Sequence, residues 1–415
     1  MRATSGSTCV APRTALASLL ALFSIGAVSA RAQTGDVPDP ANVRVQIGPL
    51  YLNPTIALTN LGVDDNVFND PASNAPKKDV TLTLTPKSDL WLHAGPTWVV
   101  GGIREDLNWY QQYSSERSAN TTFTLGWRVP LTRLAFKLNS AYTNSRERPG
   151  FEIDARAQHT AFRYDGAIEF QTLSRTFLGV TALRERTNFD DNAAFRGANL
   201  HDELNRVSTQ YGVTVREQLT TLTSVTFSGI RARDRFEFSP LRNADYTNAL
   251  VSAEFGPTAL INGSASVGYT NFQPIESGLP AFRGLIAAVN LSYTLLEATK
   301  FVGTVGRGVQ YSYDVNQPYY VQTGFTVSIA QQIFGPFDLV GRVGRQSLDY
   351  RDRTGAALTT PDRSDHVSTY GGGVGYYFGK SLRLGFNVDN TKRTSPLQDR
   401  TYQGLRYGTA LTYGG

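Results

Sequence analysis

The sequence predicts an all-β protein, a transmembrane antiparallel up-and-down β-barrel of about 18 strands, with a range of about 16 to 18. Three observations support this fold class. Apolar and polar residues alternate with a period of two, short and long breaks in that pattern alternate along the chain, and no apolar run in the body of the chain could form a transmembrane helix. Since strands cannot cross lipid with a free edge, strands of this kind must close into a barrel.

Composition agrees with one large β domain. The chain has 415 residues, 40% of them hydrophobic, with 38 Gly, 20 Tyr and 22 Phe, which suits strands and tight corners. No shift in composition divides the chain, so a single large domain is expected. There is no basic run and no nucleic-acid-binding motif, so nucleic acid is not expected as a partner.

The first residues have the character of an export signal. Arg2 and Arg13 precede a mainly apolar run of about 14 residues, which is too short for a transmembrane helix. We therefore predict a signal peptide in residues 1–32, a periplasmic lead-in in residues 33–49 and the barrel in residues 50–415. Removing the signal peptide takes away Arg2, Arg13 and Arg31 and no acid, so the formal charge falls from +5 to +2, and the single cysteine, Cys9, goes with it.

The clearest strand pair lies in residues 121–142. Phe123 and Leu125 share one face of the first strand, whereas Thr124 and Arg128 share the other. A strand with large apolar residues on one side and small or charged residues on the other fits a barrel wall that meets lipid outside and water inside.

Breaks in the alternation divide the chain into strands. Short corners are expected near residues 87–89, 129–131, 173–175, 219–221, 256–259, 296–299, 334–337 and 378–381. Longer polar loops are expected near residues 64–78, 111–119, 146–157, 188–203, 238–245, 273–282, 315–319, 349–365 and 392–401. This pattern predicts tight turns at a periplasmic rim, long loops at the other rim, and an aqueous interior in a barrel this wide.

With these features, most of residues 50–413 resembles the outer-membrane β-barrel porin families, especially the type found beside exopolysaccharide genes. The resemblance is carried by Asp64, Asp65, Asn66, Val67 and Phe68 after the first strand, followed by repeated strand–corner–strand units. It implies an outer-membrane pore of a Gram-negative-type cell, surrounded by lipid and lipopolysaccharide, and it suggests polysaccharide-export proteins as partners.

The last strand also suggests how such a protein is assembled. Tyr407, Leu411 and Tyr413 share one face of residues 405–413, which resembles the terminal strand read by the barrel assembly machinery. Here Gly414 and Gly415 follow the final aromatic residue. No cofactor is expected, and the sequence leaves the oligomeric state open.

Charged residues opposite the apolar face are the candidate pore-lining residues. They are Arg128, Lys137, Arg163, Glu169, Arg216, Glu254, Arg342 and Arg383. Rings of one sign select ions in a narrow pore, although the same charges could merely solvate an inner wall. Because arginine outnumbers acid in this set, a mild anion preference is our hypothesis.

Two other charged groups need an explanation. Asp64, Asp65 and Asp70 are weak candidates for a divalent cation, but their spacing is not that of a calcium loop, so turn formation is preferred and no metal is expected. Arg307 shares a face with apolar Val309, and a lipid-facing arginine at mid-membrane would cost about 2–4 kcal/mol. We expect either a bulge at one of its glycine neighbours that turns it inward or a contact between protomers.

These observations favour passive diffusion of small polar solutes or a channel associated with polysaccharide export. A non-conducting structural or adhesion barrel is the alternative, since long loops can fold inward. An outer-membrane hydrolase is less favoured, because His93, His159, His201 and His366 lie on separate segments with no nucleophile motif. We therefore expect no enzyme activity.

Overall fold

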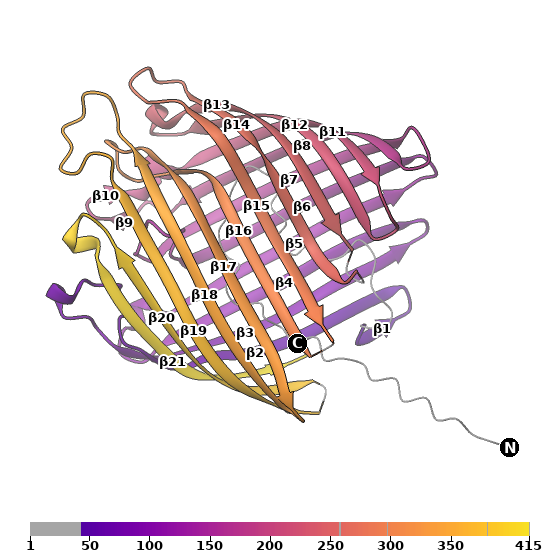
Figure 1. Ribbon diagram of the computed structural model, residues 1–415, viewed down its shortest axis with the longest axis horizontal. Coiled ribbons are helices and arrows are strands. Elements are labelled where there is room, and N and C mark those ends of the chain that lie inside the picture. Colours follow the sequence, from indigo (N-terminus) through magenta and orange to yellow (C-terminus); the bar gives the residue numbers. More distant parts are fainter. Residues whose placement is uncertain (1–42, 257–258, 297, 380, 415) are drawn as a thin grey trace.

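The computed structural model describes residues 43–256, 259–296, 298–379 and 381–414, so the predicted signal peptide lies outside the described residues. In the described residues, 18 antiparallel strands close into one barrel (Figure 1), which confirms the predicted fold class. No helix among these residues is long and apolar enough to cross a membrane.

The strands follow one another around the barrel in sequence order. They are β2 (Leu50–Asp64), β3 (Asp79–Ala94), β4 (Thr97–Tyr110), β5 (Ser118–Pro130), β6 (Leu134–Glu147), β7 (Ala157–Gln171), β8 (Thr176–Phe189), β11 (Arg206–Gln218), β12 (Thr223–Phe236), β13 (Ala244–Phe255), β14 (Ile261–Pro274), β15 (Phe282–Leu295), β16 (Thr299–Tyr311), β17 (Tyr319–Phe334), β18 (Phe337–Arg351), β19 (Ser364–Phe378), β20 (Leu382–Thr394) and β21 (Tyr402–Tyr413). β21 pairs with β2 and closes the barrel. A short strand, β1 (Val45–Ile47), pairs with the start of β2.

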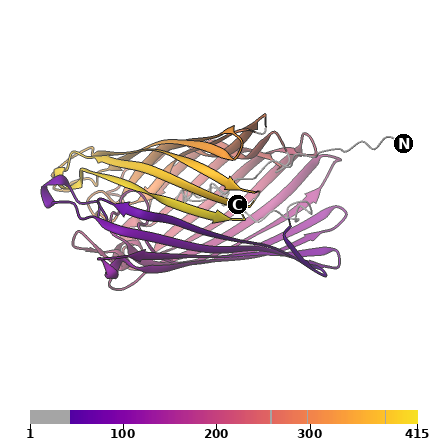
Figure 2. The same ribbon diagram turned by 90° about the horizontal axis from the view of Figure 1, so that it is seen from below.

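The two rims of the barrel differ, as predicted. One rim has tight turns, and the other carries the long loops, at the left in Figures 1 and 2. The long loops contain the small elements η2 (Ala72–Asn74), η3 (Ser114–Glu116), β9 (Ala194–Phe195), β10 (Ala198–Asn199), α1 (Leu200–Leu204), η4 (Pro240–Arg242) and η5 (Gln398–Arg400). The N-terminal end of β2 and the C-terminal end of β21 both lie at the short-turn rim. Ile56, in the first half of β2, pairs with Tyr413, the last residue of β21.

One predicted corner is wrong. Residues 87–89 lie inside β3, and the turn falls at Gly95, whose φ of 59° is in the left-handed region that glycine adopts easily. Pro86 directly precedes these residues, and proline usually marks a strand end or an edge strand. Here β3 passes through it: Pro86 lies opposite Ile56 of β2, and the pairing of β3 with β4 is interrupted at Thr85 and Pro86 and resumes at Lys87.

The wall has the predicted two faces. Along β5, Phe123, Leu125 and Trp127 are 44%, 45% and 48% exposed, whereas Arg128, which follows Trp127 and points to the other face, is 6% exposed. The interior is not uniformly polar, since Ile230 of β12 and Ile286 of β15 belong to an apolar cluster on the inner face. The outer face therefore suits lipid, and the inner face mixes charges with a few apolar patches.

Candidate functional site in the barrel interior

Most of the predicted arginines are held in ion pairs across the inner wall. Arg216 of β11 donates from Nε and Nη2 to both carboxylate oxygens of Glu169 of β7, at 3.0 and 2.8 Å. Arg163 lies 3.1 Å from Asp165 and 3.3 Å from Glu185. These two-point contacts fix the guanidinium orientation as well as the charge balance.

The same arrangement recurs among the C-terminal strands β18 to β20. Arg383 of β20 donates to both oxygens of Asp338 of β18, each at 2.6 Å. Arg342 of β18 donates to Asp389 of β20 at 3.0 and 3.1 Å. Each pair spans the intervening strand β19, so these charges lie across the inner surface rather than pointing down the pore axis.

Glycines in the middle strand leave the room for these bridges. A Cβ atom added at Gly375 of β19 would lie 2.5 Å from the Asp338 carboxylate and would overlap the guanidinium of Arg383. A Cβ atom at Gly371 would overlap the carboxylate of Asp389. The glycine-rich stretch of β19 is therefore explained by ion pairs that pass over it. The sequence shows the glycines, but only the register shows what they accommodate.

The remaining predicted residues lie apart from these bridges. Arg128 and Lys137 are directly opposite each other on β5 and β6, and Arg128 donates to the carbonyl of Leu138 at 3.1 Å. Glu254 is exposed near the end of β13, at the short-turn rim. The candidate set is thus distributed along the interior and does not form one ring of charge.

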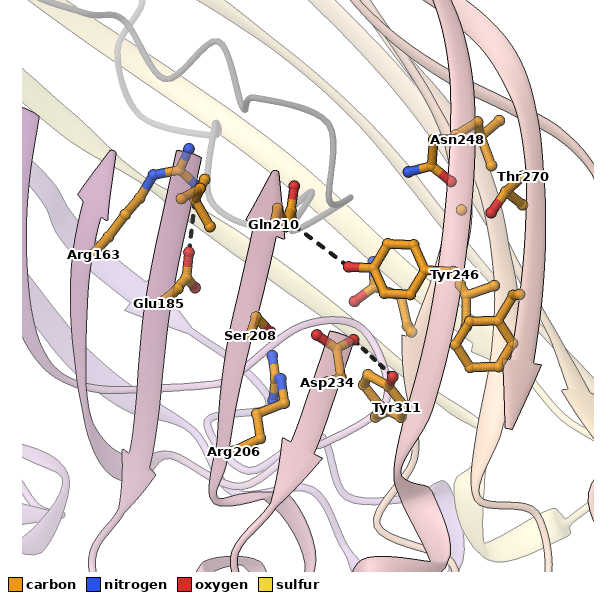
Figure 3. Close-up of a pocket in the computed structure, with 16 residues that line it drawn as sticks. Arg163, Glu185, Arg206, Ser208, Gln210, Asp234, Tyr246, Asn248, Thr270 and Tyr311 are labelled. Atoms are coloured by element: carbon orange, nitrogen blue, oxygen red, sulfur yellow. Dashed lines mark hydrogen bonds and ion pairs between the residues drawn. The ribbon is translucent and has the colours of Figure 1, made fainter. Parts of the chain in front are cut away.

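A cavity of about 80 Å³ lies in the interior, against β7 to β15 and the end of β16 (Figure 3). Arg163 and Glu185 form one side of it. The hydroxyl of Tyr311 donates to Asp234 at 2.7 Å, and the second oxygen of Asp234 and the buried amide oxygen of Asn248 have no hydrogen-bond partner among the described residues. Acceptors of this kind suit water or small solutes that donate hydrogen bonds.

The long loops fold into the barrel. Ile153 in the β6–β7 loop, Leu200 and Leu204 in α1 and Tyr313 in the β16–β17 loop belong to one buried apolar cluster. Ile153 and Leu200 are 2% and 0% exposed. Apolar burial between loops is stabilising in the same way as in a soluble core, so the long-loop rim is covered by packed chain.

Arginines hold the β6–β7 loop in this position. Arg393 of β20, which is 0% exposed, contacts Asp154 at 3.2 Å and also pairs with Asp365 of β19. Arg400 in η5 contacts the same Asp154 at 3.3 Å and donates to the carbonyl of Glu152. The loop is therefore tied directly to β20 and η5, and through Arg393 to β19, by buried, charge-assisted contacts.

Glu152 is the buried acid at the tip of this loop. It is 1% exposed, and one of its oxygens accepts a hydrogen bond from the hydroxyl of Ser312 at 2.6 Å. Burial raises the pKa of the Glu152 carboxyl, and this effect exceeds the opposing hydrogen bond from Ser312 and the positive charges of Arg400, Arg363 and Arg393. The neutral form of Glu152 therefore favours the docked loop.

The loop motif that carries the family resemblance has a structural role here. Asn66 donates to the carbonyls of Asp70 and Gln403 at 2.8 and 3.0 Å. The oxygen of Asp65 accepts from the backbone of Leu405 at 2.6 Å, and Asp64 pairs with Arg406. These contacts join the first loop to the last strand at the seam where the barrel closes. In the described residues, no group of three or more His, Cys, Asp or Glu is arranged to hold a metal ion.

The motif also helps to hold the inward loop. The carbonyl of Val67, which is fully buried, accepts from Arg148 at 2.7 Å and from Arg156 at 3.1 Å. Arg156 in turn lies 2.8 Å from Glu116. The motif therefore connects barrel closure to loop docking.

The expected bulge at Arg307 is not found, because β16 pairs with β17 without a register shift through Gly306 and Gly308. Instead β16 separates from β15 after the pair Ala287 and Arg307. Nε of Arg307 donates to the carbonyl of Leu285 at 3.2 Å, on the strand that has lost its neighbour. The arginine therefore stabilises a branch in the wall, an outcome that alternation could not predict.

The histidines lie in separate places: His93 on β3, His159 on β7, His201 in α1 and His366 on β19. His201 contacts the side chains of Asp191 and Asp202 at 3.2 and 2.9 Å. Among the described residues, none of these rings is hydrogen-bonded to a serine hydroxyl, so the structure assembles no Ser-His-acid group from them.

The class of protein to which this barrel belongs follows from a match to a known family. Residues 39–413 match the family described as "Putative beta-barrel porin 2", and the chain belongs to that family. The protein is thus an outer-membrane β-barrel of porin type. No curated protein matches the chain.

Solved barrels show distant similarity. A BenF-like porin from Pseudomonas fluorescens Pf-5 has 11% identity and a TM-score of 0.46, covering 88% of this chain and 98% of that one. Pseudomonas aeruginosa OccK2 (OpdF), in complex with glucuronate, has 9% identity and a TM-score of 0.45, covering 87% and 97%. The FrpB iron transporter (F3-3 variant) from Neisseria meningitidis has 9% identity and a TM-score of 0.39, and the match covers 83% of this chain and 62% of FrpB. Similarity this distant carries no information on the solute.

Proposed function

We propose that the protein is a channel for passive movement of small polar solutes across the outer membrane, with its long-loop rim closed in the conformation described. The inner wall carries the proposal: Arg163, Arg216, Arg342 and Arg383 lie on it, each paired with a carboxylate. Charges on the inner face of a membrane barrel are stable when that face is hydrated.

The ion pairs also bear on selectivity. Four arginines of the candidate set are neutralised by carboxylates at 2.6–3.3 Å, so the net charge of the wall is smaller than the sequence indicates. The anion preference stays a prediction, and we expect it to be weak. Reversal potentials in a salt gradient measure it directly.

The packed loops favour a second candidate, a closed structural or adhesion barrel. The apolar cluster around Ile153 and Leu200 and the buried contacts of Arg393 support it, because a rim built this way is costly to open. A role in polysaccharide export is supported by the resemblance alone, as is the proposed recognition of Tyr413 in the last strand by the assembly machinery.

Single-channel conductance of the purified protein in planar bilayers distinguishes the candidates. We expect brief or small openings from the unaltered protein and severalfold larger conductance after deletion of residues 149–155. Deletion of residues 72–76, which are exposed in the β2–β3 loop, is the matched control and should leave conductance unchanged. If neither the protein nor its loop-deleted variant conducts, the protein is a closed structural or adhesion barrel rather than a channel. Passage of long but not short oligosaccharides would instead favour polymer export.

A further inference from the structure

The outer face of the wall from β5 to β11 is hollowed along one row of directly opposed residues. The row reads Trp127, Leu138, Gly166, Ala182 and Tyr211 on β5, β6, β7, β8 and β11. Its middle members are small, whereas Leu138 and Tyr211 on either side are 52% and 63% exposed. Small residues between large ones leave an apolar groove on the lipid-facing surface, with Gly166 and Ala182 as its floor.

Arginines gather at one end of this groove. Moving from the floor toward the long-loop rim, Arg184 follows Ala182 on β8, and Arg233 lies on β12 in the same cross-strand row, each paired with Thr209 of β11. Arg231 is opposite Tyr211 at the groove's edge. All three arginines are exposed on the outer face.

Acidic neighbours leave part of this charge uncompensated. Arg186 lies 3.2 Å from Glu237, and Arg231 lies 3.5 Å from Asp245. Arg184 and Arg233 have no ion-pair partner among the described residues. Outward-facing arginines on a lipid-facing wall are costly unless they lie at the headgroup level and meet negative charge.

We propose that this face binds one lipid of the outer leaflet whose headgroup carries phosphate. An acyl chain lies in the groove over Gly166 and Ala182, and the phosphate accepts hydrogen bonds from Arg184 and Arg233. The direction fits this occupant, because the arginines are on the long-loop side of the floor and the apolar wall continues toward the short-turn side with Val129, Phe136 and Ile168. Guanidinium groups suit phosphate because their donors match its oxygens in pairs.

Native mass spectrometry of the full-length barrel in detergent tests the proposal. The probes are a phosphatidylglycerol, a diacylglycerol with the same chains, and inorganic phosphate. We expect the phosphatidylglycerol to bind at least tenfold more tightly than the diacylglycerol. The double variant R184Q/R233Q should lose about tenfold in affinity, and Ala182→Phe, which fills the groove and changes no charge, should lose a similar amount. Arg345→Gln, on the distant outer face of β18, is the control and should have no effect.

Three results would overturn the proposal. Equal binding of both lipids would remove the role of the arginines. Inorganic phosphate that competes fully, together with normal binding to Ala182→Phe, would reduce the site to a surface anion patch. A dimer in the mass spectra that Ala182→Phe dissociates would show that the face contacts a second copy of the chain. Because none of these readouts uses conductance, failure here is distinguishable from failure of the proposed channel.

Discussion

Two hairpins of the barrel, β5–β6 and β16–β17, have the same alternation but use it differently. In β5–β6 the apolar face is outside along its whole length, with Leu125 45% exposed. In β17 the same face is exposed at Phe325, at 41%, yet Val321 and Tyr319 further along it are 0% and 1% exposed. The same face of β17 therefore meets lipid in the half nearer the short-turn rim and protein in the half nearer the long-loop rim, which we call its upper half.

The upper half has left the wall. Tyr311 packs edge to face on Phe236 of β12, with ring centroids 4.7 Å apart, and Tyr319 lies 5.1 Å from Phe272 of β14. Phe236 and Phe272 belong to the inner face of the barrel, in phase with Asp234 and Thr270 of the cavity. The long-loop ends of β16 and β17 therefore bend across the barrel interior. Two strands of the barrel thus narrow its interior on that side.

The branch after Ala287 and Arg307 gives the largest expected contrast. The predicted mature chain has no cysteine, so engineered pairs report without background. Val289→Cys with Val305→Cys, which are directly opposed, should form a disulfide almost completely on mild oxidation. Leu285→Cys with Val309→Cys would be opposed only if the ladder continued, and we expect almost none. Gel mobility with and without reductant measures both. Complete linkage of the second pair would show that β16 stays in the wall.

Matched truncations on β17 separate its two environments by energy. Tyr319→Ala should lower the free energy of unfolding by about 3–5 kcal/mol, because it leaves a cavity among buried aromatic rings. Phe325→Ala, on the same face of the same strand, should cost less than about 1 kcal/mol, since lipid replaces the lost side chain. Guanidinium unfolding in liposomes, with hydrogen exchange of the β17 amides, measures both. Equal losses would mean that both residues meet the same surroundings.

The bridged ion pairs test the inner face of the regular wall. Gly375→Ala should cost about 1–3 kcal/mol, because the added methyl displaces the contact of Arg383 with Asp338. Gly341→Ala is the control, since a Cβ atom there meets nothing within 4 Å. Unfolding of the two variants under the same conditions gives the difference. A neutral Gly375→Ala would indicate that the bridge is looser than described.

Much of the fold could be predicted because a period of two is a local signal. Leu125 and Arg128 are three residues apart on one strand, so their spacing alone places them on opposite faces of it. The clusters of turn-forming residues predicted the position of every long loop. The corner assigned to residues 87–89 failed because Pro86 is tolerated where the ladder on one side is interrupted. Local chemistry there favoured a turn, and the pairing of neighbouring strands decided against it.

The interior could be predicted only in part. Alternation placed Arg383 on the inner face, but its partner Asp338 is distant in sequence and is brought near it by strand register. Tyr311 is in phase with Arg307 and Val309, so alternation alone would place it on the outer face, where it would be in a complete wall. The alternation of apolar and polar residues gives the direction of a side chain relative to its own strand. It does not show whether that strand stays in the barrel wall or bends into the interior. The loop contacts of Glu152 depend on long-range packing and had no sequence signal.

The smallest expected effect concerns the pH dependence of loop docking, which involves Glu152 and has no counterpart in β5–β6. Burial raises its pKa in the docked state above the ordinary glutamate value of about 4.3. The stabilisation from the neutral acid is therefore complete below that value and is lost as the pH rises through the raised pKa. Hydrogen exchange of residues 148–156, corrected for intrinsic rates, should show stronger protection at acidic pH. Glu152→Gln keeps a neutral acceptor for Ser312 and should abolish the dependence, whereas Glu276→Gln, at an exposed loop position, should retain it. A dependence that persists in Glu152→Gln would place the titrating group elsewhere among the charges that hold the loop.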